Sequence, residues 1–379
     1  MSQTAMPSPA SKSPQAERIV LSVDAMGSDK GPAAVVAGCS HFAKANKSVF
    51  FLLHGRAAEL EQLVARKKNL RDRCTIVDAE GIVSMDDKPA QVMRSGKGTS
   101  MWSALDSVRE GKATVCVSCG NTGALMALSV IRLRKVPGVY RPAIAVLWPS
   151  RNPQGFNVML DAGADIRADE RDLLQYALMG ASYARNGLNL KMPRVGLLNV
   201  GTEEFKGRAE IQAANELIAE NAKAAQFDYV GFVEGSDLPG KKCDVIVTDG
   251  FTGNIALKTG EGTASLISDL LREAFKYTPL SRLAALLSYT SLKRLSRRID
   301  PRQVNGGVFL GLNGTVVKSH GSADATGVAA ALKLAHQLAQ SGFNEKLAAR
   351  ISAATMLAGE SGSGHPADDT DEQTDKARS

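Results

Sequence analysis

The chain has 379 residues with a hydrophobic content of 44% and a net charge of +7. Its length allows a large buried core, either as one large α/β domain or as two of ordinary size. The sequence argues against two classes of protein. No basic run is interleaved with aromatic residues as in nucleic-acid-binding proteins, and no apolar run is long enough to span a bilayer as in integral membrane proteins.

Predicted strands and helices alternate along the chain. Strands are expected at residues 19–23, 49–53, 74–77, 113–117, 143–148, 157–160, 195–199, 229–233, 245–248, 308–312 and 316–318. Helices are expected at 33–45, 57–65, 102–110, 125–133, 170–184, 210–222, 328–339 and 345–357, and a basic loop at 88–98. The alternation predicts a largely parallel sheet covered on both faces. A strand pair at 143–160 and a hairpin over Asn313-Gly314 make the sheet mixed.

The two ends of the chain differ in composition from the middle. Residues 1–18 are rich in Ser, Pro and Ala and lack the apolar centre of a signal peptide, so we expect a disordered lead-in. Residues 359–379 are first Gly/Ser-rich and then acidic, which predicts a disordered, solvated tail. A single α/β domain is therefore expected over 19–358. The five scattered cysteines form no disulfide framework, which favours the reducing cytosol.

Small and polar residues follow five of the predicted strands. These segments are 24–27, 120–123, 161–165, 201–207 and 249–254. Because parallel strands open their carboxyl ends on one edge of a sheet, we expect the five segments to form one ligand site there. Thr252 is expected to cap the helix that follows the last of them. Such a helix start presents backbone N–H donors to an oxyanion such as phosphate, although any single turn of this kind is more often structural.

Several familiar kinds of site are absent from the sequence. No Gly-x-Gly-x-x-Gly follows a predicted strand, and the five histidines are dispersed. The segment 235–241 begins like a phosphate-binding loop, but Lys242 replaces the magnesium-binding Ser or Thr. Cys116 and Cys119 lie on a predicted strand about 10 Å apart, too far for a disulfide, so we expect buried, inert thiols. We therefore expect no metal and no cofactor, and a site that holds an oxyanion without forming a covalent enzyme intermediate.

Six motifs occur in an order that resembles the phosphate acyltransferases of bacterial phospholipid synthesis, the acyl-carrier-protein:phosphate transacylases. The motifs are Val23-Asp-Ala-Met-Gly27, Gly120-Asn-Thr-Gly-Ala124, Leu160-Asp-Ala-Gly-Ala-Asp165, Asn199-Val-Gly-Thr-Glu-Glu-Phe-Lys-Gly207, Thr248-Asp-Gly-Phe-Thr-Gly-Asn254 and Lys318-Ser-His-Gly321. The resemblance covers residue 19 to about 357. Ser28, Cys119 and Ala162 depart from the family pattern, each by a small change in size.

The resemblance implies a Rossmann-like, three-layer α/β/α fold similar to isocitrate and isopropylmalate dehydrogenases and to phosphotransacetylases, in a homodimer. The implied reaction transfers a long-chain acyl group from acyl carrier protein to inorganic phosphate. The acyl phosphate then feeds the glycerol-3-phosphate acyltransferase of the membrane. The implied location is the cytoplasm, with peripheral association to the inner face of the cell membrane.

The resemblance also assigns roles to individual residues. Lys206 and Asn254 match the catalytic lysine and asparagine of the family. Spacing alone would instead predict a solvent-exposed charge for Lys206 and a helix cap for Asn254. The other residues expected at the substrate are Asp24, Gly27, Asn121, Thr122, Gly123, Asp161, Thr252, Gly253 and His320. Of these, the aspartates are expected to orient loops, as is Asp249. His320 has the intrinsic pKa range to protonate the departing thiolate, or it holds a turn.

Residues 264–300 form a basic amphipathic segment. Its apolar stripe is predicted to contain Leu280, Leu283, Leu287, Leu292, Leu295 and Ile299. Arg282, Lys293, Arg294, Arg297 and Arg298 lie opposite that stripe, and the local net charge from Ala264 to Arg298 is +5. The family resemblance favours an interfacial anchor on anionic lipid. Packing against the core or a dimer partner, and docking of the acidic carrier protein, stay open.

Three other functions are alternatives to long-chain acyl transfer to phosphate. The nearest is a short-chain phosphotransacetylase that acts on coenzyme A thioesters. A non-catalytic membrane scaffold that binds carrier protein is a different class, and it gives no reason for Lys206 and Asn254. A dehydrogenase is less favoured because the dinucleotide fingerprint and a helical pair of metal carboxylates are absent.

Overall fold

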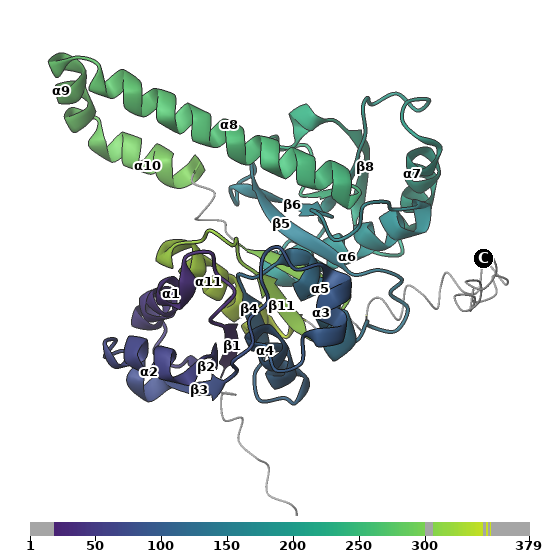
Figure 1. Cartoon of the computed structure of the whole chain (residues 1–379). Coiled ribbons are helices and arrows are strands. Elements are labelled where there is room, and N and C mark those ends of the chain that lie inside the picture. The colour runs from purple at the N-terminus through teal and green to yellow at the C-terminus, as the bar shows by residue number, and fades with distance from the viewer. Residues whose placement is uncertain (1–18, 300–305, 344–345, 348, 350–379) are drawn as a thin grey trace, which may run out of the picture.

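The computed structural model describes residues 19–299, 306–343, 346, 347 and 349 of the chain (Figure 1). The predicted lead-in, the acidic tail and nearly all of the last predicted helix lie outside the described residues. Within them, a single sheet runs through the whole α/β body.

The strands and helices follow the predicted order closely. The strands are β1 (Val20–Asp24), β2 (Phe50–Gly55), β3 (Cys74–Asp78), β4 (Val115–Ser118), β5 (Ala143–Pro149), β6 (Phe156–Leu160), β7 (Arg194–Leu198), β8 (Asp228–Val233), β9 (Val245–Val247), β10 (Gly307–Leu310) and β11 (Thr315–Lys318). The helices are α1 (Gly31–Ala45), α2 (Ala57–Ala65), α3 (Pro89–Ser95), α4 (Ser100–Arg109), α5 (Thr122–Leu133), α6 (Glu170–Leu188), α7 (Ala209–Ala222), α8 (Gly250–Lys276), α9 (Pro279–Leu287), α10 (Tyr289–Ile299) and α11 (Ala325–Ser341). Two short 3₁₀ turns, Arg71–Arg73 and Gly235–Asp237, complete the set.

The sheet has eleven strands in the order β3-β2-β1-β4-β11-β10-β5-β6-β9-β7-β8. Most neighbours are parallel, and three consecutive pairs in the middle are antiparallel: β11 with β10, β10 with β5, and β5 with β6. The predicted strand pair and hairpin are therefore confirmed. The α/β fold with a mostly parallel, mixed sheet is confirmed as well.

Helices cover both faces of the sheet, and each face has its own apolar core. The larger core joins α1, α2, α6, α7 and α11 to one face of the strands. On the other face, α3, α4 and α5 enclose a second core around Leu125 and Leu128. A third, small core lies under the start of α8, where Ala256 packs beside Met159 and Ile246.

The directions of the strands correct the expectation that all five polar loops share one edge. Three successive antiparallel pairs reverse the strand direction, so β6, β9 and β7 run opposite to β1, β4 and β11. The loops at 24–27 and 120–123 therefore lie at one end of the sheet. Those at 161–165, 201–207 and 249–254 follow strands that end at the opposite end.

Two local predictions are also wrong. The segment 88–98 contains the helix α3, in which Pro89 occupies the first turn and Val92 is buried in the second core. Proline suits that position because its missing N–H would have no helical partner there. The cap of α8 is Asp249 rather than Thr252, since the Asp249 carboxylate accepts from the Thr252 N–H at 2.7 Å and the helix begins at Gly250.

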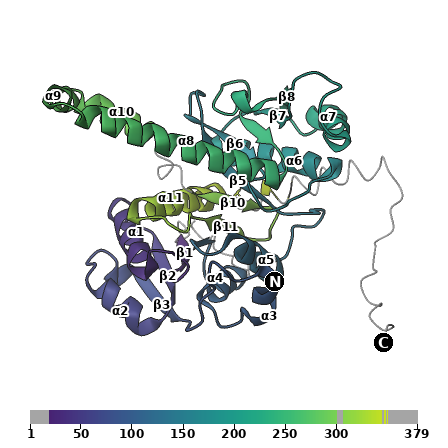
Figure 2. The same cartoon turned by 45° about the horizontal axis from the view of Figure 1, so that its top comes forward.

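Residues 264–299 extend from the body as a helical arm. The 27 residues of α8 span ~40 Å, and its second half projects beyond the sheet in both views (Figures 1 and 2). The short helix α9 lies at its far end, and α10 runs back from there toward the body (Figure 1). Leu280, Leu283 and Leu287 are 76%, 53% and 79% exposed, so they do not pack on the core of this chain. Leu295 is also exposed, and Leu292 is half-buried. Among the described residues, no helix has the length and apolar character needed to cross a membrane.

Candidate active site

The loops after β6 and β9 fit closely together at one end of the sheet. The carboxylate of Asp161 is buried and accepts from the N–H groups of Ile144 and Asp165, each at 2.8 Å. Burial outweighs these hydrogen bonds and raises the pKa of Asp161 to about 6. Gly253 packs directly on the Asp161 carbonyl, where a side chain would not fit. Asp161 and Gly253 thus fix the position of the first turn of α8, and Asp161 orients its loop as expected.

Asn254 is exposed at the start of the second turn of α8 and faces the loop after β6. A Cβ atom at Gly163 would lie 3.6 Å from the Cβ of Asn254, and Gly163 has a φ of 116°, which favours glycine. The close approach of the Gly163 backbone leaves the Asn254 carboxamide at the surface, one turn from the helix start. Thr252 is exposed beside it. The carboxamide is therefore placed to donate a hydrogen bond to a ligand.

Lys206 lies on the loop after β7, on the other flank of α8. Its ammonium group forms an ion pair with Glu203 at 3.0 Å and is partly exposed. The Asn199 carboxamide donates to the Lys206 carbonyl at 3.0 Å and closes the loop. Two residues further on, Arg208 forms an ion pair with Asp249, which joins this loop to the start of α8. Among the described residues, no hydrogen bond or ion pair joins Lys206 directly to Asn254.

A buried carboxylate organises the opposite end of the sheet, where β1 and β4 end. Asp24 accepts from the hydroxyls of Ser100 and Ser118, each at 2.7 Å. Its pKa is raised because burial outweighs these hydrogen bonds. A Cβ atom at Gly27 would lie 2.7 Å from the backbone nitrogen of Gly120, so glycine allows the two loops to touch. Asp24 and Gly27 therefore shape the loops, and the Asp24 carboxylate is too buried to meet an anion from solvent.

The loop after β4 begins α5. Asn121 caps this helix by accepting from the Ala124 N–H at 3.0 Å, and its amide group donates to the carbonyls of Met85 and Asp87. These three contacts give the Asn121 side chain a structural role. Thr122 and Gly123 form the first turn of α5, and a Cβ atom at Gly123 would lie 2.8 Å from the Pro89 side chain of α3. Backbone N–H groups are thus the donors that this turn can offer to a phosphate.

The first half of α8 connects the two ends. Lys258 on α8 donates to Glu261 at 2.9 Å, and its ammonium nitrogen lies 3.3 Å from Nε2 of His320, in the loop after β11. Burial, followed by the charge of Lys258, lowers the pKa of His320. The loops after β6 and β11 follow strands that run in opposite directions, but both loops approach the same face of α8. Lys258 and Glu261 were not predicted at the site, although their spacing of four and seven residues from Asn254 is that of one helical face.

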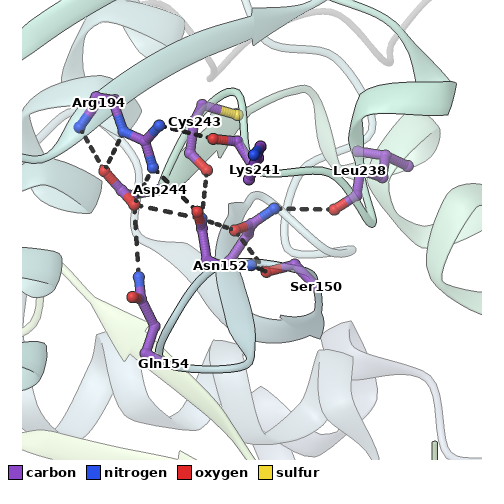
Figure 3. A network of polar contacts seen from close by, with 9 residues as sticks. Ser150, Asn152, Gln154, Arg194, Leu238, Lys241, Cys243 and Asp244 are labelled. Atoms are coloured by element: carbon purple, nitrogen blue, oxygen red, sulfur yellow. Dashed lines mark hydrogen bonds and ion pairs between the residues drawn. The ribbon is translucent and has the colours of Figure 1, made fainter.

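A polar network fixes the far ends of β7 and β9, away from Asn254 (Figure 3). Arg194 makes two hydrogen bonds to the Asp244 carboxylate, at 3.0 and 2.8 Å, and one to the Lys241 carbonyl at 2.6 Å. Asn152, in the turn between β5 and β6, accepts from the same guanidinium and donates to the Cys243 carbonyl. This network orients the strands whose other ends carry the site.

The predicted cysteine chemistry can be compared with the structure. Cys116 and Cys119 are 0% and 2% exposed, and all five cysteines are free. Burial raises the pKa of Cys119 to about 11. The expected burial of these thiols is confirmed. A buried thiol with a raised pKa is a poor nucleophile.

Solved structures define the class of this fold. A phosphotransacetylase from Streptococcus pyogenes aligns with a TM-score of 0.57 and 14% identity, covering 86% of this chain and 95% of its own. The EutD phosphotransacetylase from Staphylococcus aureus aligns with a TM-score of 0.54 and 15% identity, covering 86% of this chain and 94% of its own. At such identities the likeness concerns the fold alone, which is that of the phosphotransacetylases.

Sequence comparison then gives the family. The family model described as "Fatty acid synthesis protein" matches residues 19–346. A phosphate acyltransferase from Ruegeria sp. (strain TM1040) is 71% identical over 343 residues, 90% of this chain and 92% of the relative. One from Paracoccus denitrificans (strain Pd 1222) is 69% identical over 342 residues, 90% and 92% of the two chains. The chain belongs to the phosphate acyltransferase family, whose members are transferases.

Proposed function

We propose that this enzyme transfers a long-chain acyl group from acyl carrier protein to inorganic phosphate and so supplies acyl phosphate for phosphatidic acid synthesis. The observation that carries the proposal is the exposed Asn254 carboxamide, which follows the first turn of α8 that Asp249 caps and lies against the backbone of Gly163. Donors fixed before the reaction stabilise an oxyanion without a cost of reorganisation. Family membership supports acyl transfer to phosphate as the reaction.

The chemistry needs no covalent enzyme intermediate. An oxygen of hydrogen phosphate bonds to the thioester carbonyl carbon, and the tetrahedral oxyanion then expels the thiolate as the C–S bond breaks. The proton that phosphate carried ends on the thiolate sulfur. Asn254 donates to the oxyanion, and Lys206 attracts phosphate to the same end of the sheet.

Rates of the variants Lys206→Ala and Asn254→Ala test these roles. Both residues are exposed or partly exposed, so each variant should fold as wild type does. Loss of a preorganised oxyanion donor lowers turnover by roughly 10²–10³-fold, and we expect losses of this order in acyl phosphate formation. Circular dichroism checks the fold, and near-wild-type rates in both variants would contradict the mechanism.

A short-chain phosphotransacetylase that uses coenzyme A thioesters is the nearest alternative. We expect palmitoyl carrier protein to react with a much higher kcat/KM than acetyl-CoA. The reverse preference would assign the chain to the short-chain class. A scaffold without catalysis would bind carrier protein and turn over neither substrate.

We further propose that the helical arm attaches the enzyme to the cytoplasmic face of the membrane. The leucines of α9 are exposed, and so is Arg282, which suits an apolar face in lipid and basic groups at anionic headgroups. Each basic residue near an anionic surface contributes ~1 kcal/mol. Leu283→Glu and Leu287→Glu should reduce co-sedimentation with phosphatidylglycerol vesicles, and unchanged binding counts against the anchor.

The same leucines could instead be covered by a second copy, since we also propose a homodimer. Light scattering separates the two roles. If Leu283→Glu converts a dimer to a monomer and leaves vesicle binding intact, the arm serves assembly. If the dimer persists and vesicle binding falls, it serves the membrane, where the glycerol-3-phosphate acyltransferase would receive the product.

A further inference from the structure

A cluster of charged side chains lies one turn beyond Asn254 on α8. Lys258 follows Asn254 by four residues, so the two side chains lie on the same face of the helix, ~6 Å apart at their Cβ atoms. Glu261 accepts from the Lys258 ammonium group at 2.9 Å, and His320 lies 3.3 Å from it. The ammonium group is therefore held beside the carboxamide that the proposed function uses.

The contacts of Lys258 leave a donor for a ligand. An ammonium group carries three N–H donors, and that of Lys258 donates one to Glu261 and lies 3.3 Å from Nε2 of His320. Nδ1 of the same ring faces Ser322, whose N–H donates to it at 3.4 Å and whose hydroxyl lies 3.0 Å away. At most two of the three N–H donors of Lys258 are therefore engaged by this cluster, and the third can reach a ligand.

Lys258 is also the accessible cation of its cluster. Its side chain is 54% exposed. Lys318, the other lysine near His320, is half-buried, and its ammonium group donates to the Cys119 carbonyl. Burial lowers the pKa of Lys318 to about 8. A phosphate that approaches from solvent would therefore meet Lys258 first.

The position of Lys206 leaves a role for a second cation. Lys206 lies on the β7 flank of α8 in an ion pair with Glu203, whereas Asn254 faces the β6 loop and shares its face with Lys258. The dianion of hydrogen phosphate, together with the oxyanion that forms on the thioester, places several negative charges beside Asn254. One carboxamide is a neutral donor, and a cation on the same face would balance that charge.

We propose that Lys258 is a further catalytic residue, whose ammonium group contacts phosphate on the Asn254 face of α8 while Glu261 and His320 position it. This inference rests on the proposed function, since it adds a residue to the same reaction. Lys258 stabilises the attacking phosphate and the tetrahedral oxyanion by charge and keeps its own proton. The proton of hydrogen phosphate still passes to the thiolate.

Steady-state kinetics with phosphate as the varied substrate test Lys258. We expect Lys258→Met to lower kcat/KM for phosphate by roughly 10²-fold or more. Lys258→Arg should restore part of that loss because it keeps the positive charge. Lys112→Met is the matched control, because Lys112 also pairs with a glutamate at 2.8 Å but lies in the turn before β4, at the opposite end of that strand from His320. It should react as wild type does.

Calorimetric titration with inorganic phosphate separates this inference from the proposed function. Weaker phosphate binding in Lys258→Met than in wild type and Lys112→Met supports the inference, even if no acyl phosphate forms and the proposed function fails. Wild-type phosphate affinity together with wild-type kcat/KM in Lys258→Met overturns it. Lys258→Gln, which keeps a neutral donor, replaces Lys258→Met in both measurements if the methionine variant does not fold.

Discussion

Asp249 is the residue at which the stability of the fold and the geometry of the site are most directly linked. Its carboxylate is 3% exposed, caps α8 through the Thr252 N–H and pairs with Arg208, two residues beyond Lys206. Asp249→Ala removes both contacts. Asp249→Asn keeps an oxygen that can cap the helix and removes only the charge.

The expected cost follows from these two contacts. Replacing an Asp cap by Ala costs ~1 kcal/mol, within a range of about 0.5–2 kcal/mol. The pair with Arg208 adds about 0–1 kcal/mol, because that side chain is 59% exposed and water screens it. We therefore expect Asp249→Ala to lose about 0.5–3 kcal/mol of unfolding free energy. Asp249→Asn should lose about 1 kcal/mol less than Asp249→Ala.

Urea unfolding monitored by circular dichroism gives these free energies, and acyl phosphate formation gives the effect on the site. Turnover should fall further in Asp249→Ala than in Asp249→Asn, since only the former frees the turn that carries Asn254. Arg208→Met should retain the cap and show an intermediate rate. Equal stability and equal turnover in the alanine and asparagine variants would refute the argument that the cap positions Asn254.

Two further predictions concern buried polar groups that take no part in the proposed reaction. Arg194→Met leaves the Asp244 carboxylate without its cation, and because Arg194 is 35% exposed we expect a loss of about 2 kcal/mol rather than the full ~3–5 kcal/mol of a deeply buried pair. In a urea double-mutant cycle, the variant with both Arg194→Met and Asp244→Asn should lose less unfolding free energy than the two single variants added together. Strictly additive losses would contradict the coupling between the two side chains. Burial lowers the pKa of His54 from 6.5 to about 4, so the unfolded chain binds a proton at a higher pH than the folded protein does. The protein should therefore lose up to about 3 kcal/mol of unfolding free energy as the pH falls from 6.5 to 4. His54→Gln should remove that part of the pH dependence in unfolding measurements from pH 7 to 4, and an unchanged slope would show that His54 is not its source.

Local sequence patterns were sufficient to predict most of the fold. The strand-helix alternation, the hairpin over Asn313-Gly314 and the pair around residues 152–155 depend on short-range patterns and turn residues. The direction of half the sheet could not be predicted, because it depends on β10 pairing with β5, whose residues Val308 and Ala145 are far apart in sequence. That one pairing adds the third reversal and sends the two groups of loops to opposite ends.

In the candidate site, too, residues in local motifs could be predicted, and contacts between residues far apart in sequence could not. The motifs identified Asn254 and Lys206 by resemblance, and the Asp249 carboxylate was correctly expected to orient a loop. Lys258 was missed because a helical Lys three residues before a Glu usually forms a solvated pair on a surface. Only the folded chain shows that His320, 62 residues further on in the loop after β11, meets that lysine.

We propose that phosphate itself attacks a long-chain acyl thioester beside Asn254 of α8. The most direct measurement incubates the enzyme with palmitoyl carrier protein and radiolabelled inorganic phosphate, and compares the label recovered in acyl phosphate with the thiol released. We predict one labelled phosphate for each thiol in wild type, and the loss of both signals in Asn254→Ala. Release of thiol without incorporation of label, or no release at all, would contradict the account.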